Sequence, residues 1–392
     1  MNTAWNADLT FGLPFRTPEF DSDGQSGFSD SELEEIQLIW QRVAEDFIAF
    51  DVNITTEDPG VEALTNSGGA DEHWGLRVAV GGSCHDWYVP AGGVAYEGSF
   101  TWDSDTPAYV FEKDVPGVKA AAETISHEVG HSLGLHHDGD GSSEYYRGHG
   151  DWSPIMGLTT SHEVTQWSRG DYEGANNQED DLEIITTQNG FGYRPDDFAN
   201  TTEEAVMVTA DSGTLALAGI IEQNTDEDIF AINVEAAGEL DLAFLPAAVG
   251  ANLDIDVILL DEHGNVVATN DQEGLSARIV ATLEPGTYYV CISGKGHGAV
   301  NPDYSDYGSI GAYSVEGTLP TAQPSIETTT DQTSVDQIPG DTNGDGVVSF
   351  QDFLILSQNF GTTDAAFADG DFDGNGTVGF EDFLILAQNF GA

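Results

Sequence analysis

One short segment, HEVGHSLGLHHD, beginning at His127, constrains the local fold more than any other part of the chain. Histidines four residues apart share one face of a helix, so His127 and His131 can bind one tetrahedral metal ion while Glu128 faces the same cleft. Gly134 can adopt a positive φ, end that helix and turn the chain back. The reversal brings His137 to the third ligand position. The segment therefore predicts a zinc site formed by three histidines.

The spacing H-E-x-x-H-x-x-G-x-x-H resembles that of the metzincin clan of zinc endopeptidases. Asp138, directly after the third histidine, is most similar to the adamalysin (reprolysin) branch. The resemblance implies a methionine turn beneath the metal, and Met156 in residues 152–157 is the candidate; a core methionine in a Pro/Gly turn is the alternative. Other branches place a tyrosine ligand two residues after this methionine. This chain has Leu158 there, so no tyrosine ligand is expected.

Other residues near the motif are rival candidates for the third ligand. His136 is adjacent to His137 but lies one residue off the clan spacing, so we expect it in solvent or in a supporting position. Glu144 or Glu163 would complete a gluzincin-type site, although a correctly spaced histidine is already present. Histidines expected at the surface or in structural positions are His149 and His162.

Three histidine ligands leave one zinc position for water, which predicts hydrolysis of protein or peptide substrates. Glu128 would take the proton of that water and pass it to the leaving amine. The alternative is a cell-surface adhesion or assembly protein whose zinc domain has lost activity. The intact Glu128 and the three histidines favour the peptidase.

Residues 1–195 are expected to form the α/β metzincin-like catalytic domain that the resemblance implies. Residues 29–32 form a capping box, and apolar side chains recur at helical spacing from residue 33 to residue 47. Strands are expected at 7–11, 52–55 and 77–80, and the zinc-bearing helix at 120–133. In the resembling family a strand upstream of this helix pairs with extended substrate. Residues 78–81 are the candidate, with an ordinary sheet strand as the alternative.

Composition indicates the surroundings of the protein. Sixty-nine acidic and ten basic residues give a net charge of −59, which disfavours nucleic acid and anionic membranes as partners. Screening in calcium-rich or salty surroundings would relieve the repulsion, so we expect an extracellular or cell-surface location. No apolar run approaches the roughly 18 residues of a membrane span. Residues 1–5 lack a signal-peptide pattern, which a mature chain or a start site assigned too late would explain.

Residues 205–319 change to short alternating segments separated by Gly, Asn and Asp, which predicts an all-β sandwich. Strands are expected at 214–222, 228–234, 240–245, 253–260, 277–283, 287–293 and 312–318. The motifs DEDIF, GN and LEPGTYYV, from residue 226 onward, resemble the non-catalytic bacterial pre-peptidase C-terminal domain. Asp226 and Asp228 are open to two interpretations, calcium ligands or solvated turn carboxylates. Cys84 and Cys291 fall in different expected domains, which predicts free thiols.

Residues 320–339, rich in Ser, Thr, Pro and Gln, are expected to be a flexible linker. Residues 340–392 contain an internal repeat, in which DTNGDGVVSFQDFLIL at 341–356 aligns with DFDGNGTVGFEDFLIL at 371–386. Oxygen-bearing residues at loop positions 1, 3, 5 and 12, with glycine at 6, are typical of calcium-binding loops. The sequence therefore predicts a small α-helical, EF-hand-like domain that requires Ca²⁺.

The repeated loops resemble a type I dockerin, in which aspartate ends each loop. The resemblance implies Asp341, Asn343, Asp345, Ser349 and Asp352 as ligands of the first ion, and Asp371, Asp373, Asn375 and Asp382 as ligands of the second. It also implies a cohesin-like or cell-surface partner. Dockerins often carry small hydroxyl residues at loop positions 10 and 11, where this chain has Phe350 and Gln351 in one copy and Phe380 and Glu381 in the other.

Overall fold

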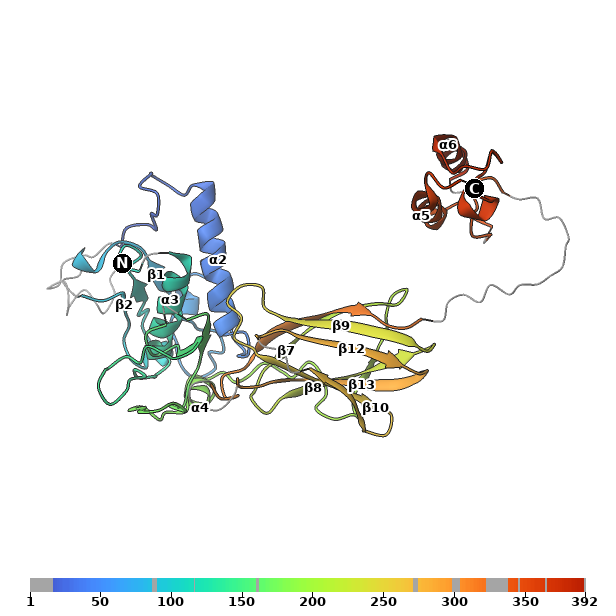
Figure 1. The fold of residues 1–392 in the computed structure, drawn as a ribbon. Helices are drawn as coiled ribbons and strands as arrows, with labels where there is room; N and C mark the ends of the chain where they lie inside the picture. Colours follow the sequence, from blue (N-terminus) through green and yellow to red (C-terminus); the bar gives the residue numbers. More distant parts are fainter. Residues whose placement is uncertain are drawn as a thin grey trace. The chain divides into compact units, whose positions relative to one another are not determined.

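The computed structural model describes residues 17–86, 90–115, 117–159, 162–270, 274–297, 304–321, 338–344, 346–363 and 365–390. The chain divides into two compact units, Met1–Gln323 and Pro324–Ala392 (Figure 1). The first unit contains a helical region with small sheets, followed by a β-sandwich. The strand expected at 7–11 and the expected ligand Asp345 lie outside the described residues.

The helical region contains three α-helices, three 3₁₀ turns and five strands within the described residues. The α-helices are α2 (Asp30–Asp46), α3 (Val118–Ser132) and α4 (Asp181–Gln188), and the 3₁₀ turns are η1 (Val61–Leu64), η2 (Cys84–Asp86) and η3 (Ser99–Thr101). The strands are β1 (Val78–Val80), β2 (Gly93–Val94), β3 (Ala108–Val110), β4 (Trp152–Pro154) and β5 (Val164–Gln166).

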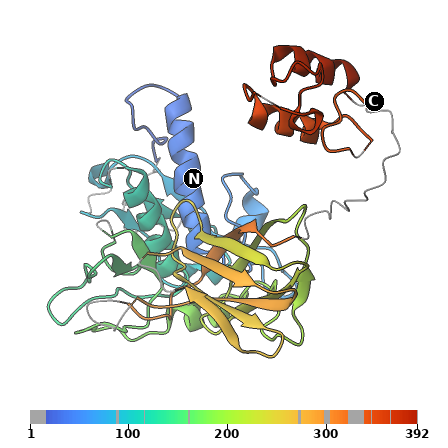
Figure 2. The ribbon, with the colours of Figure 1, turned by 45° about the vertical axis from the view of Figure 1, so that its right-hand side comes forward.

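Helix α2 begins at the predicted capping box. Ser29 Oγ accepts a hydrogen bond from Glu32 N (3.3 Å), and the Glu32 carboxylate accepts one from Ser29 N (2.9 Å). This exchange satisfies amides that a helix start leaves unpaired. Ile39 and Val43 of this helix are buried, and α2 packs against α3 (Figure 2). The helix predicted from residue 33 to residue 47 is therefore confirmed.

A three-stranded sheet in the order β1-β3-β2 packs against α3. β3 is its buried centre, with β1 parallel on one side and β2 antiparallel on the other. The strand predicted at 77–80 corresponds to β1. The strand predicted at 52–55 is wrong: these residues pair with no strand, and Ile54 O accepts instead from the Trp40 indole N–H (2.8 Å). Apolar alternation alone gives no information about whether a pairing partner is present.

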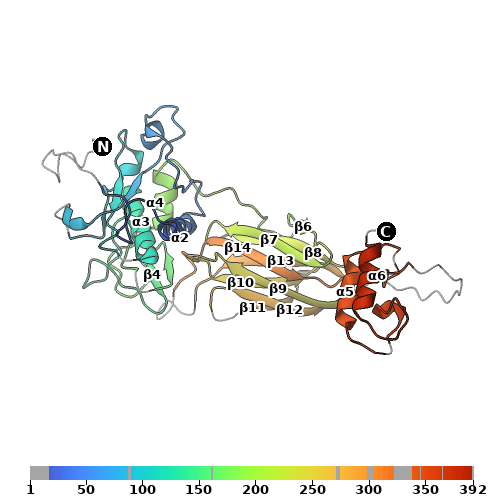
Figure 3. The same cartoon turned by 90° about the horizontal axis from the view of Figure 1, so that it is seen from above.

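The sandwich consists of two antiparallel-rich sheets in the orders β11-β10-β13-β8-β6 and β12-β9-β14-β7 (Figure 3). Its strands are β6 (Val206–Val208), β7 (Thr214–Ile221), β8 (Glu227–Val234), β9 (Gly238–Pro246), β10 (Ile255–Asp261), β11 (Val266–Asn270), β12 (Ala277–Leu283), β13 (Gly286–Gly294) and β14 (Gly311–Thr318). Every strand that the sequence predicted for the sandwich has a counterpart. The two strands that the sequence did not predict, β6 and β11, are short, mostly exposed edge strands with little alternating burial.

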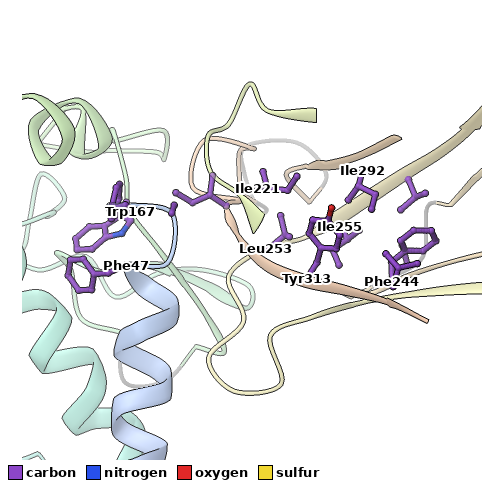
Figure 4. Packing of buried hydrophobic residues seen from close by; sticks show 14 of the residues in the cluster. Phe47, Trp167, Ile221, Phe244, Leu253, Ile255, Ile292 and Tyr313 are labelled. Carbon is purple, nitrogen blue, oxygen red and sulfur yellow. The ribbon is translucent and has the colours of Figure 1, made fainter. Parts of the chain in front are cut away.

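The helical region and the sandwich share one continuous apolar cluster. Phe47 and Trp167 on the helical side belong to the same cluster as Ile221 and Leu253 of the sandwich (Figure 4). The rings of Phe47 and Trp167 meet edge to face with centroids 5.3 Å apart. The two regions are therefore joined by packed side chains as well as by the chain itself.

The second unit repeats one structure twice. Its helices are α5 (Phe350–Asn359) and α6 (Phe380–Asn389), with the 3₁₀ turn η4 (Phe367–Asp369) between them. Its core consists of Val348, Leu356, Val378 and Leu386, two pairs at equivalent positions of the repeat. Both cysteines are free, as predicted: Cys84 is buried and Cys291 partly buried.

Candidate metal centres

The three motif histidines meet at the end of α3. The helix ends as predicted, with Gly134 at φ 100° and Leu135 N donating to Gly130 O (3.0 Å). This reversal places nitrogens of His127, His131 and His137 within 4.8 Å of one another. The Nε2 atoms of His131 and His137 are 2.9 Å apart.

The hydrogen bonds of these rings fix where their lone pairs point. Each Nδ1 faces an oxygen that can only accept, so each Nδ1 carries the hydrogen and each Nε2 a lone pair. The oxygens are Ile155 O for His127 (2.9 Å), Leu135 O for His131 (2.8 Å) and Glu144 Oε1 for His137 (2.9 Å). Burial lowers the pKa of His127 to about 3 and also lowers that of His131. Because each Nδ1 is engaged in one of these hydrogen bonds, the Nε2 atoms of the three rings are the ones available to a cation.

Glu128 lies beside this cluster with a side chain that is 6% exposed. Burial raises its pKa to about 8. Gly93 of β2 makes room for it, because a Cβ there would lie 2.7 Å from Glu128 Cγ and 2.8 Å from Oε1. The candidate substrate-pairing strand at 78–81 corresponds to β1, which is a strand of this sheet. β1 lies at the opposite edge of the sheet from β2, and β2 is too short to give a periodic sequence signal.

Met156 lies against the helix that carries the motif. It is fully buried, and a Cβ on Gly130 of α3 would come within 2.4 Å of its sulfur. Glycine at this helix position therefore lets the methionine approach the backbone. Asp138 N donates to Met156 O (2.8 Å), which ties the turn to the segment that holds His137.

The rival ligands lie elsewhere. His136 is outside the cluster, bonded to Glu97 (2.8 Å) and Glu179 (2.7 Å), and the Glu179 carboxylate raises its pKa. Glu144 is a hydrogen-bond partner of His137 at Nδ1, and Glu163 is exposed. The remaining histidines bond locally, His149 to the Tyr146 hydroxyl (2.8 Å) and His162 to Gly150 O (3.0 Å).

Tyr145 belongs to the site although the sequence did not indicate it. Its ring centroid lies 4.2 Å from that of His137 and 6.0 Å from that of His127. Burial raises its pKa, with further contributions from the carboxylates of Glu144 and Glu128. The family pattern places a possible tyrosine ligand two residues after Met156, where this chain has Leu158. No motif in the sequence distinguishes Tyr145 from the other tyrosines.

A second group of ligand atoms lies at one end of the sandwich. Oxygens of Asp196, Glu222 and Asp226 lie within 4.8 Å of one another. Asp226 is 7% exposed and Asp228 fully buried, so the interpretation as solvated turn carboxylates is wrong. Among the described residues, Glu222 Oε2, Asp226 Oδ1 and Asp228 Oδ1 have no hydrogen-bond partner. Burial, then nearby carboxyl groups, raises the pKa of Glu222 to about 9. Such oxygens fit a divalent cation.

The repeated loops of the second unit place their predicted ligands together. Oxygens of Asp371, Asp373 and Asp382 lie within 4.8 Å of one another. Asp382 also accepts amide hydrogens from Phe372 (2.8 Å) and Gly379 (2.8 Å), which closes the loop onto α6. Asn375 lies in the same loop, where its amide hydrogen is donated to the carboxylates of both Asp371 and Asp373.

The first loop repeats this closure with equivalent residues. Asp352 accepts amide hydrogens from Thr342 (2.9 Å), Asn343 (3.2 Å) and Ser349 (2.8 Å). Asp341 accepts those of Gly344 and Gly346, and Ser349 is also the N-cap of α5. The aspartate at loop position 12 thus closes the loop through its hydrogen bonds and is also a candidate ligand.

Comparison with known proteins identifies the second unit. Residues 339–391 match the dockerin type I domain family. This match supports Ca²⁺ as a bound ion, a cohesin-like partner and an extracellular location. No curated protein matches the chain. None of the helices described above combines the length and hydrophobicity of a bilayer span.

Two solved structures are similar to parts of the chain. One is the pre-peptidase C-terminal domain of collagenase from Bacillus anthracis, 19% identical over 30% of this chain and 97% of that chain, with a TM-score of 0.23. The other is a type II cohesin-dockerin domain from Bacteroides cellolosolvens, 38% identical over 15% of this chain and 92% of that chain, with a TM-score of 0.14. TM-scores this low do not support a structural assignment.

We expect calcium to stabilise the sandwich more at about pH 8.5 than at about pH 6. The raised pKa of Glu222 means that the metal-free fold binds the proton of this carboxyl group more tightly than the unfolded chain does. The stability that this proton contributes to the fold is lost as pH rises toward 9. Calcium binds the deprotonated form and offsets that loss. Calorimetry should show the calcium-induced shift reduced by Glu222→Gln and unchanged by the exposed control Glu235→Gln. Equal shifts in both variants would contradict the cation site.

We expect residues 338–392 to lose helical circular dichroism on chelation and to regain it with calcium. The loop carboxylates repel one another until a cation binds, so binding energy becomes folding energy. Asp373→Ala should lower the calcium stoichiometry from two to one, whereas the exposed neighbour Glu381→Gln should keep two. A helical signal that chelator leaves intact would show that the fold is independent of calcium.

Proposed function

We propose that this protein is a secreted zinc metalloendopeptidase with His127, His131 and His137 as zinc ligands. The convergence of three imidazoles whose Nδ1 atoms are already hydrogen-bonded supports the proposal, because it leaves their Nε2 atoms available to a cation. A bound zinc ion would polarise a substrate carbonyl and lower the pKa of a water molecule. The donor set, three imidazoles with fixed tautomers, fits this metal.

The surrounding side chains would provide the remaining chemistry. Glu128 would accept the proton of the attacking water and deliver it to the leaving amine. The Tyr145 phenol, whose ring is tilted by 41° against that of His137, would be a donor for the carbonyl oxygen as negative charge develops. β2 is an edge strand in the described sheet and adjoins Glu128, so it can pair with an extended peptide.

The second unit supports an additional role in assembly. Its family match favours attachment to a cohesin-like or cell-surface partner. Phe350 and Phe380 are 61% and 59% exposed, and Leu354 and Leu384 are 41% and 43% exposed, at equivalent repeat positions. Exposed apolar side chains on a small unit are typical of a binding surface. In the alternative, an inactive cell-surface adhesion or assembly protein, the β-sandwich and this unit would carry the function.

We expect Glu128→Ala to retain zinc and to lose at least about a thousandfold in kcat, since the general base is removed while the ligands remain. His137→Ala should lose zinc as well as activity. His136→Ala is the matched control and should retain both, because its contacts are to Glu97 and Glu179. Zinc analysis and casein digestion measure both properties. Full activity of Glu128→Ala would exclude the mechanism.

We expect Phe350→Ala combined with Phe380→Ala to weaken binding of the calcium-loaded chain to a type I cohesin at least about tenfold. Both copies are changed because either could form the contact. The calcium-induced helical signal should be unchanged, since both side chains are exposed. Surface plasmon resonance tests this, with Val266→Ala, an exposed sandwich residue, as control. Unchanged affinity in the double variant would exclude this surface.

A further inference from the structure

A single asparagine of the sandwich connects two elements of the helical region, α2 and β5. Asn252, 5% exposed, lies between β9 and β10. Its Nδ2 donates to Asp46 Oδ1 at the end of α2 (2.8 Å). Its Oδ1 accepts from Thr165 N of β5 (3.1 Å), and its backbone oxygen accepts from Gln166 Nε2 (2.6 Å). Both polar atoms of the Asn252 side chain and its backbone carbonyl are therefore hydrogen-bonded to the helical region.

Two short routes lead from these contacts to His127. Through β5, Gln166 O accepts from Ile155 N (2.9 Å), and Ile155 O is the oxygen that accepts from His127 Nδ1 (2.9 Å). Through α2, Asp46 Oδ2 accepts from the hydroxyl of Ser126 (2.5 Å), the residue before His127 on α3. Asn252 thus supports both the carbonyl that orients the His127 ring and the helix that carries it.

The junction around Asn252 is closely packed. A Cβ on Gly308 of the sandwich region would lie 2.6 Å from Trp167 O and 2.7 Å from Gln166 Cβ. The buried Tyr307 hydroxyl accepts from Leu182 N (2.8 Å) and donates to Asp180 (2.7 Å) of the helical region. The apolar cluster of Figure 4 continues across the same boundary. Little free space is available for β5 to move when the sandwich is held in place.

We propose that the sandwich is a structural part of the histidine site and that Asn252 is a positioning residue for His127. The inference rests on the proposed function for its catalytic readout. The inference goes beyond the proposed function because it makes the sandwich a support for the metal ligands and not a separate domain. Ring orientation and tautomer at a ligand depend on the partner of its other nitrogen, so a displaced Ile155 carbonyl weakens metal binding.

The side chains of Asp46 and Asn252 have similar shapes, so the carboxyl group and the amide can be exchanged between the two positions. Asn252→Asp alone would remove the amide hydrogen that Asp46 accepts and place two buried carboxyl groups in contact, and Asp46→Asn alone would leave two amides facing each other. In the double variant, the amide at residue 46 can donate to the carboxylate at residue 252 while its oxygen still accepts from Ser126. The carboxylate at residue 252 keeps a second oxygen for Thr165 N. The swap therefore restores the whole set of hydrogen bonds.

The test compares zinc affinity in full-length, calcium-saturated protein by competition with a chromogenic chelator. We expect Asn252→Asp to weaken zinc about tenfold and to lower kcat with little change in KM. The combination of Asp46→Asn with Asn252→Asp should recover most of the affinity. Asn233→Ala, at an exposed asparagine of β8, is the control and should equal the parent.

Calorimetry provides a readout that does not depend on zinc or activity. In the parent, the helical region and sandwich should unfold in one transition; Asn252→Asp should separate it into two, and the swapped pair should restore one. A parent chain that binds no zinc would exclude the proposed function while this measurement still tests the junction. A single variant with parental zinc affinity, or a swapped pair that recovers neither affinity nor the shared transition, would overturn the proposal.

Discussion

The convergence of three imidazoles is the constraint on which the rest of the first unit depends. The Nε2 atoms of His131 and His137 are only 2.9 Å apart, and hydrogen bonds to the other nitrogen of each ring hold the two rings in this arrangement. These bonds, and the corresponding bond of His127, come from a helix end turned by Gly134, from Ile155 before Met156, and from Glu144. The fold around the site can be understood as the framework that keeps these acceptors in position.

The sequence predicted the convergence of these histidines because its information is local. Helical spacing and a glycine place His127, His131 and His137 within a single turn and its return, and no distant contact is needed. The thirty-residue repeat likewise carries its own loop pattern, and the alternating segments gave the sandwich strands. Edge strands β6 and β11 were not predicted because neither face is fully buried, so no alternation is present.

The features that the sequence analysis did not predict all depend on long-range packing. The role of β2 depends on where Gly93 meets Glu128, and a two-residue strand has no period to detect. Asp226 and Asp228 occupy a turn-like sequence, yet neighbouring strands bury them. Tyr145 lies over His137 through the course of a loop, and Asn252 reaches β5 across the junction. None of these contacts leaves a trace in local composition or spacing.

The central claim is that the three histidines form a zinc site with nitrogen ligands. Zinc K-edge X-ray absorption of the purified, calcium-saturated chain containing one added equivalent of zinc tests it directly. The account predicts three imidazole nitrogens at about 2.0–2.1 Å and one further light-atom ligand. A spectrum dominated by carboxylate oxygens, which would place the metal in the acidic loops, or one containing a sulfur ligand from Cys84 or Cys291, would contradict it.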